Sequence, residues 1–295
     1  MVSSPNVVTP PPLSPDELAR ILRKPPLWRR PDVMRAAIIA TVSTIAVILI
    51  LRWLLMQSTG WESVQTSFLS REHFKEAFPK VWEGFKLNVR IFLIAEPIVL
   101  IVSLLLAIMR GLTSPALFPL RTLAILYIDF FRGAPALLVI LTLGFGVPGL
   151  RIDSLPNSPV FWGTVACIIT SSAYTAETFR AGIDSIHPSQ RAAARSLGLS
   201  GIQTFRYVVL PQGVRRVIPP LLSGFVSLQK ETSLVSVIGP LDATRQAQIY
   251  SSLKFNYSSY LAAALLFILV TIPLARLTDY LMARTGSARQ IGGEV

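Results

Sequence analysis

Charged residues are scarce in this chain, and the residue types that build most metal and nucleophilic sites are nearly missing. Aspartate, glutamate, lysine and arginine make up 15% of its 295 residues, against about 25% in a typical soluble domain. There is one cysteine, Cys167, and the two histidines, His73 and His187, lie far apart. A disulfide within the chain is therefore excluded, and no zinc or Cys–His spacing exists. Cys167 lies in an apolar run, which predicts a small buried side chain.

A phosphate-binding loop is also missing from the sequence. A Walker A loop needs Gly-Lys-Ser/Thr after a glycine-rich turn, and none of the six lysines follows a glycine. No hydrolase elbow and no helical metal motif is present either. We therefore expect no enzyme activity, no metal and no cofactor in this chain. Any ATP and Mg²⁺ that drive it would bind to another subunit.

Apolar residues, in contrast, make up 52% of the chain and gather in segments long enough to cross a bilayer, which takes about 20 helical residues. This pattern predicts an all-α integral membrane protein with six transmembrane helices. The predicted spans cover residues 36–56, 88–109, 134–150, 160–182, 214–238 and 259–282. The net charge is +12, but its arginines cluster beside apolar runs. That distribution is typical of membrane orientation and argues against nucleic-acid binding.

Positive charge orients these spans. Basic residues outnumber acidic ones in three polar segments: 1–35, 183–216 and 284–295. Such segments stay in the cytoplasm, and all three do so only if residues 117–150 cross once. We therefore predict that 117–133 is a helix at the cytoplasmic side or entering from it, that 57–84 lies outside, and that both termini are cytoplasmic. The proline-rich N-terminal arm is expected to be partly disordered.

The polar segment "HPSQRAAARSLGLSG" (187–201) has the features of a short helix. Its alanines favour helix, Ser189 is the predicted N-cap, and Gly198 is placed to end it. About nine helical residues are marginal in water, so the helix needs a packing partner. One low-relief face holds Gln190, Ala193, Ala194 and Leu197, and Arg191 and Arg195 mark another. A second helical piece is expected to break at Pro211. A solvated connector with orienting arginines stays open as an alternative.

Polar residues inside the predicted spans need a reason, because a charge there costs about 2.5–3.5 kcal/mol on insertion scales. The candidates for lining a transport path are Glu96, Tyr174, Glu177, Lys230, Thr232 and Ser233. Glu177 and Arg180 are three residues apart, and a structural pair is favoured over a place in the path. The polar cluster at 230–233 is favoured for the path. Asp129 and Arg132 have the same spacing, which predicts another pair.

Four segments, in this order, resemble the permease subunits of binding-protein-dependent ABC importers, in the branch for polar amino acids. They are "YIDFFRGAP" (127–135), "AYTAETFRAGIDSI" (173–186), "SQRAAARSLGLSGIQTFRYVVLP" (189–211) and "SLQKETSLVSVIG" (227–239). The third matches the family's E-A-A, Leu-Gly, Leu-Pro pattern at Ala193, Ala194, Leu197, Gly198, Leu210 and Pro211. The glutamate of that pattern falls on Ala192, so the carboxylate is missing here.

The resemblance implies a fold and a function. The fold is a type I ABC importer permease core of five spans over residues 85–283, and residues 36–84 would add a transmembrane helix and an external loop. The function is amino-acid import through a path formed by alternating access, in a bacterial cytoplasmic (inner) membrane. A separate ATP-binding cassette ATPase would couple to the loop over 187–211. The loop residues implied are Gln190, Arg191, Ala192, Ala193, Ala194, Arg195, Leu197, Gly198 and Pro211.

Further partners follow from the same resemblance: an extracytoplasmic solute-binding protein, a second permease subunit and membrane lipid. Two other functions remain open from the residues alone. An autonomous secondary carrier or channel would use intramembrane carboxylates such as Glu96, although no internal repeat typical of such carriers is visible. A membrane scaffold would transport nothing. An ATPase that co-purifies with the chain separates the importer from both alternatives.

Overall fold

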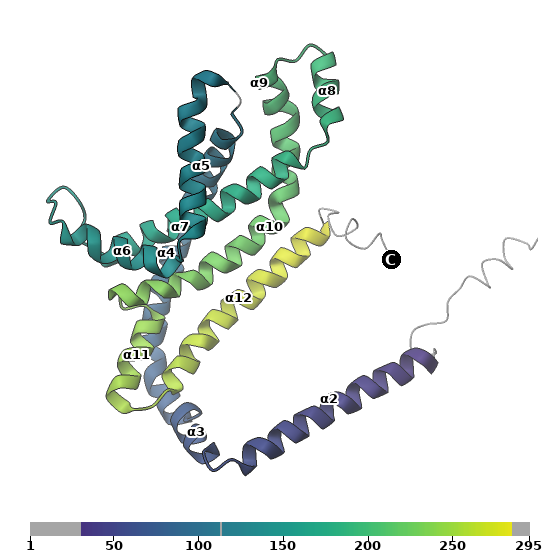
Figure 1. Cartoon of the computed structure of the whole chain (residues 1–295). Helices are drawn as coiled ribbons and strands as arrows, with labels where there is room; N and C mark the ends of the chain where they lie inside the picture. Colours follow the sequence, from purple (N-terminus) through teal and green to yellow (C-terminus); the bar gives the residue numbers. More distant parts are fainter. Residues whose placement is uncertain (1–30, 113, 285–295) are drawn as a thin grey trace, which may run out of the picture. The chain divides into compact units, whose positions relative to one another are not determined.

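A computed structural model describes residues 31–284 except 113 (Figure 1). The described residues form helices and connecting turns, with no strand among them, so the prediction of an all-α protein is confirmed. The predicted cytoplasmic arm up to residue 30 and the tail from residue 285 lie outside the described residues. The chain divides into two compact units, one ending at Ser63 and the other beginning at Val64.

The first unit contains α2 (Pro31–Gln57). No charged residue lies between Arg35 and Arg52, and the helix is long and apolar enough to cross a membrane. The hydroxyls of Thr41 and Thr44 donate to carbonyl oxygens one turn earlier, at 2.8 and 2.7 Å. These bonds satisfy the polar side chains without water, as a lipid-facing helix requires. The helix matches the predicted span over 36–56.

α3 (Trp61–Phe68) and the long helix α4 (Arg71–Arg110) show that most of the segment 57–84, predicted as a loop, is helical, whereas its place outside the membrane stays a prediction. Ser70 caps α4 by accepting from the His73 backbone N–H at 3.4 Å, and Gly111 ends it. The first turns of α4 bury Ala77, Val81 and Phe85 in one hydrophobic cluster with residues of α11 and α12. This four-residue apolar period, hidden among charged residues, explains why the segment is helical.

Three described helices are long and apolar enough to cross a membrane. They are α2, the α4 region and α12 (Ser258–Arg284). α5 (Phe118–Gly133), preceded by the 3₁₀ turn η2 (Pro115–Leu117), and α6 (Ala136–Gly149) make a fourth only if this pair, bent by 104°, counts as one span. The sequence predicted this division after residue 133, and Pro135 explains it because proline disfavours helix in the residue before it. The predicted count of six crossings stays a prediction.

The other two predicted spans are helical and pack together. α7 (Pro159–Asp184) contacts α4, α5, α6 and α10 (Leu210–Glu231). Its buried face includes Ala166, Ala173 and Cys167, and the last is only 2% exposed, as predicted. A Cβ on Gly213 of α10 would lie 3.2 Å from the Ile183 Cα of α7. Glycine therefore allows the two backbones to approach closely at this end.

The loop between α7 and α10 forms α8 (Pro188–Ser196), α9 (Gly201–Thr204) and the π-helical turn η3 (Phe205–Val209). The N-cap of α8 is His187 and not Ser189, because Pro188 occupies the first helical position, where its missing N–H costs nothing. Gly198 ends the helix with φ +83°, as predicted. Pro211 does not break the second piece, since it lies in the first turn of α10, directly after η3.

The predicted span over 214–238 ends differently from the prediction. After α10 the chain continues as the 3₁₀ helix η4 (Thr232–Ile238), and then as α11 (Ala243–Lys254), which the sequence analysis missed. The fully buried Asp242 caps α11. Asn88 of α4 donates to its carboxylate at 3.0 Å and accepts from the Ala243 N–H at 3.1 Å. Gly84, one turn earlier, leaves room for this close approach.

Candidate functional site

A cavity of about 290 Å³ with several polar side chains in its walls lies between α6, α7 and α10. Its lining residues are Ala136, Thr170, Ser171, Tyr174, Thr175, Gly224, Ser227, Leu228 and Glu231. Glu231 supplies the one carboxylate among them, and Ser171 of α7 donates to it from the opposite wall at 3.5 Å. A carboxylate surrounded by hydroxyl groups in a membrane helix bundle can hold a cationic ammonium group.

The spacing of these residues along their helices explains why they share one cavity. Gly224, Ser227 and Glu231 follow the i, i+3, i+7 pattern of one face of α10. Ser171 and Thr175 of α7 lie four residues apart and face it. The residues predicted to line a path did not include Glu231, Ser171, Thr175 or Ser227. The helical spacing of these polar residues is the signal in the sequence that marks this face.

The structure separates the six residues predicted to line a path. Tyr174 lines the cavity. The others lie elsewhere: Lys230 is exposed, Ser233 is half-buried, Thr232 is fully buried beneath Asn88, and Glu96 is buried in α4. Glu177 belongs to a network of charges. The run 230–233 is divided because consecutive helical residues point in directions about 100° apart.

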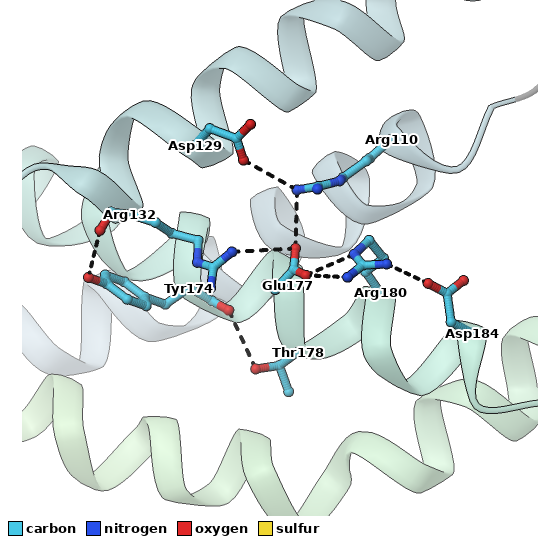
Figure 2. A network of polar contacts seen from close by, with 8 residues as sticks. All are labelled: Arg110, Asp129, Arg132, Tyr174, Glu177, Thr178, Arg180 and Asp184. Atoms are coloured by element: carbon cyan, nitrogen blue, oxygen red, sulfur yellow. Dashed lines mark hydrogen bonds and ion pairs between the residues drawn. The ribbon is translucent and has the colours of Figure 1, made fainter.

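Figure 2 shows the charge network, which joins the ends of α4, α5 and α7. Glu177 lies at its centre. Its Oε2 accepts from Arg110 Nη1 at 3.1 Å and lies 3.8 Å from Arg132 Nη1. Its Oε1 accepts from the Nε and Nη2 of Arg180, which confirms the predicted i, i+3 pair. One carboxylate therefore faces three guanidinium groups from three different helices.

The predicted pair of Asp129 with Arg132 is wrong. Asp129 Oδ1 lies 3.7 Å from Arg110, and Arg132 turns to Glu177. The backbone carbonyl of Arg132 also accepts from the Tyr174 hydroxyl at 3.1 Å (Figure 2). Tertiary partners on α4 and α7 therefore replace the local pair. Tyr174 also lines the cavity. It therefore connects the charge network to the cavity wall, near the end of α5.

The loop over 187–211 projects α8 and α9 from the end of the second unit (Figure 1). The face predicted from spacing is split, since Ala194 is 4% exposed whereas Leu197 is 83% exposed. Exposed positions also include Gln190, Arg191, Ala192, Ala193, Arg195, Gly198 and Pro211. Arg191 donates to the Ile183 carbonyl at 3.2 Å and Arg195 to the Leu199 carbonyl at 3.1 Å. These hydrogen bonds hold the exposed residues of the loop in place, and Ala194 is the buried residue of α8.

Comparison with known proteins identifies the family of this chain. Residues 87–287 match the family described as the binding-protein-dependent transport system inner membrane component. The chain belongs to this family. It is thus an ABC importer permease, and the resemblance found in the sequence is confirmed. Within the described residues, no group of three or more His, Cys, Asp or Glu side chains is placed to hold a metal ion.

Two curated relatives illustrate the match. The probable glutamine ABC transporter permease protein GlnM of Bacillus subtilis is 37% identical over 196 residues, 65% of this chain and 88% of that protein. The glutamine transport system permease protein GlnP of Escherichia coli is 32% identical over 200 residues, 68% of this chain and 90% of that protein. Both alignments cover most of the relative, so the permease is similar to whole subunits of this kind.

Solved structures agree with this membership. A chain in the crystal structure of an amino acid ABC transporter with histidines has a TM-score of 0.63 and 33% identity, over 70% of this permease and 94% of that chain. An inward-facing methionine transporter, MetNI, has a TM-score of 0.59 at 13% identity, over 70% of this permease and 96% of that chain. The second likeness concerns the fold alone.

Proposed function

We propose that this permease is the membrane subunit of an ATP-driven importer for amino acids. The single observation that carries the proposal is the cavity between α6, α7 and α10, in which the Glu231 carboxylate accepts from the Ser171 hydroxyl and Ser227 also lines the wall. An amino acid needs both a counter-charge for its ammonium group and hydrogen-bond donors for its carboxylate. The names of the relatives, which refer to glutamine and amino acids, support this substrate class.

In this proposal, Glu231 binds the α-ammonium group of the substrate. A free carboxylate inside a bundle is costly, and a cationic group that enters the cavity offsets that cost. The hydroxyl of Thr175 lies on the α7 wall and is available to the substrate carboxylate, whereas the Tyr174 hydroxyl donates to the Arg132 carbonyl. Glu96, on which an autonomous carrier would depend, does not line the cavity.

Energy would enter through the loop over 187–211. A separate ATPase binds ATP and Mg²⁺, moves α8, and converts the path between inward-open and outward-open states, as a two-state element biased by a partner. α8 follows the end of α7 after only three residues, and α7 forms one wall of the cavity. Movement of the loop therefore has a short path to the substrate site.

The wider assembly belongs to the same proposal. The chain crosses a bacterial inner membrane six times with both ends in the cytoplasm, and α2 is the crossing added to a five-span core. A second permease subunit completes the path, and a solute-binding protein delivers the amino acid from outside. Residues 57–84 have no excess of basic over acidic residues, whereas the loop over 183–216 is basic. Both observations support this orientation.

Glu231→Gln is expected to lower kcat/KM for ATP-driven amino-acid uptake by at least tenfold. Removing one partner of a desolvated charge pair costs about 2–5 kcal/mol, so tenfold is a conservative bound. Uptake of labelled substrate by proteoliposomes measures the effect. Glu83→Gln is the matched control, because its side chain is 66% exposed on α4 and pairs with Lys86. Equal uptake by Glu231→Gln and the wild type would remove Glu231 from the path.

Cross-linking tests the coupling loop. Cys167, the one cysteine in the sequence, is buried, so a thiol introduced by Ala193→Cys on exposed α8 is the accessible one. We expect this variant to cross-link to the cognate ATPase in the assembled transporter, and a thiol introduced by Lys80→Cys on α4 not to do so. Cross-linking from position 80 alone would contradict the proposed orientation of the chain.

A further inference from the structure

The coupling loop carries charge of one sign. Between Asp184 and Glu231 the sequence contains no acidic residue. The basic residues in the same interval are Arg191, Arg195, Arg206, Arg215, Arg216 and Lys230. Position 192, where the family pattern has glutamate, is alanine. A partner that docks on this loop therefore meets a positive surface, and the loop provides no carboxylate for the contact.

Two of these arginines are held in place on α8. Arg191 and Arg195 are exposed, and each uses one N–H to bind a backbone carbonyl of its own loop. A guanidinium has five N–H donors, so each keeps donors for a bidentate contact with a partner carboxylate. Residues four apart on a helix rise by about 6 Å. The loop thus presents two oriented guanidinium groups on residues one helical turn apart, one anchored at the Ile183 carbonyl before α8 and the other at the Leu199 carbonyl after it.

Exposed apolar residues follow these arginines in the same loop. Leu197 is 83% exposed, Ile202 is 81% exposed and Tyr207 is 62% exposed. Leu197 caps the C-terminal end of α8, and Ile202 lies in α9 directly after the turn. Several exposed large apolar side chains on one polar loop favour a protein contact. Ala192 and Ala193, which are also exposed, leave the surface low enough for close approach.

We propose that the ATPase which receives this loop presents an acidic groove: two carboxylates that pair with Arg191 and Arg195, beside an apolar pocket for Leu197 and Ile202. This inference rests on the proposed function and adds the chemistry of the partner. The permease supplies the cations and the ATPase the anions. An anionic lipid surface carries negative charge as the proposed acidic groove does. However, a fluid layer of headgroups does not require guanidinium groups that are fixed by backbone carbonyls.

The test is a binding titration with the purified full-length permease in nanodiscs and its cognate ATPase, at low and at high salt. We expect the double variant Arg191→Glu, Arg195→Glu to raise Kd at least tenfold at low salt and to lose most of the salt dependence, because exposed ion pairs are screened by salt. Lys80→Glu on α4 reverses one exposed charge outside the loop and should leave Kd unchanged. A glutamate-to-arginine change in the ATPase groove should restore binding to the double variant.

Each outcome decides between separate claims. If the double variant binds the ATPase as tightly as the wild type, the acidic groove is wrong and the proposed function stands. If the effect of the arginines disappears when anionic nanodiscs are replaced by zwitterionic ones, the loop contacts lipid and the acidic groove is again wrong. If the wild-type permease binds no ATPase and ATP drives no uptake, the proposed function fails first.

Discussion

Glu177→Gln is expected to lower the free energy of unfolding of the permease by about 2 kcal/mol. The carboxylate of Glu177 faces Arg110, Arg132 and Arg180, and its side chain is only 21% exposed. Removing one member of a buried ion pair costs about 3–5 kcal/mol, and this site is partly open to solvent, so a smaller loss is expected. Unfolding by SDS in mixed micelles measures the change.

Asp129→Asn is the matched control for this prediction. Asp129 is in the same network, but its side chain is 59% exposed and lies 3.7 Å from Arg110. An exposed pair at that distance contributes about 0–1 kcal/mol. If Asp129→Asn destabilises the permease as much as Glu177→Gln does, Glu177 does not contribute more to stability than the other carboxylate of the network.

Because α7 leads into α8, Glu177→Gln should also reduce the uptake obtained per ATP hydrolysed.

Gly84→Ala is expected to have a still larger effect, a loss of about 3 kcal/mol in the free energy of unfolding. A Cβ at this position would lie 2.5 Å from the carbonyl carbon and oxygen of Asp242 and 2.7 Å from the Ala243 nitrogen. These are backbone atoms, which no change of rotamer can move aside, so α11 must shift away from α4. The shift would break the buried hydrogen bonds from Asn88 to Asp242 and from Ala243 to Asn88.

Gly146→Ala provides the control, since it is the same substitution inside another helix. Apart from the backbone of its own helix, no atom would lie within 4 Å of a Cβ at Gly146. Alanine is the better helix former by about 1 kcal/mol, so this variant should be as stable as the wild type or slightly more stable. Equal stability of Gly84→Ala and the wild type would show that α11 does not depend on the close contact with α4.

The sequence predicted the apolar helices well and the polar helices poorly. The spans over 36–56, 88–109 and 259–282 correspond to α2, the second half of α4 and α12, because a long apolar run allows few other structures. The start of α4 and the whole of α11 were missed. Their segments are rich in charged and polar residues, and they form helices because small faces such as Ala77–Val81–Phe85 and Ala243–Ala247 are buried against each other.

The candidate site was predicted only in part, for a related reason. The Glu177–Arg180 pair depends on neighbours in one helix, so spacing was enough to find it. Glu231 depends on α6 and α7 placing a cavity beside it, and the true partners of Asp129 and Arg132 lie on other helices. Contacts of that kind follow from tertiary packing. The pattern of one segment does not contain them.

ATP-driven import is decided by uptake of labelled amino acids into proteoliposomes that contain this permease, its cognate ATPase and its solute-binding protein. We expect concentrative uptake of at least one amino acid that needs internal ATP, the ATPase and the binding protein together. The permease alone, with a proton or sodium gradient, should accumulate none. Gradient-driven uptake by the permease alone, with no effect of ATP, would rule out the ATP-driven importer and establish an autonomous carrier.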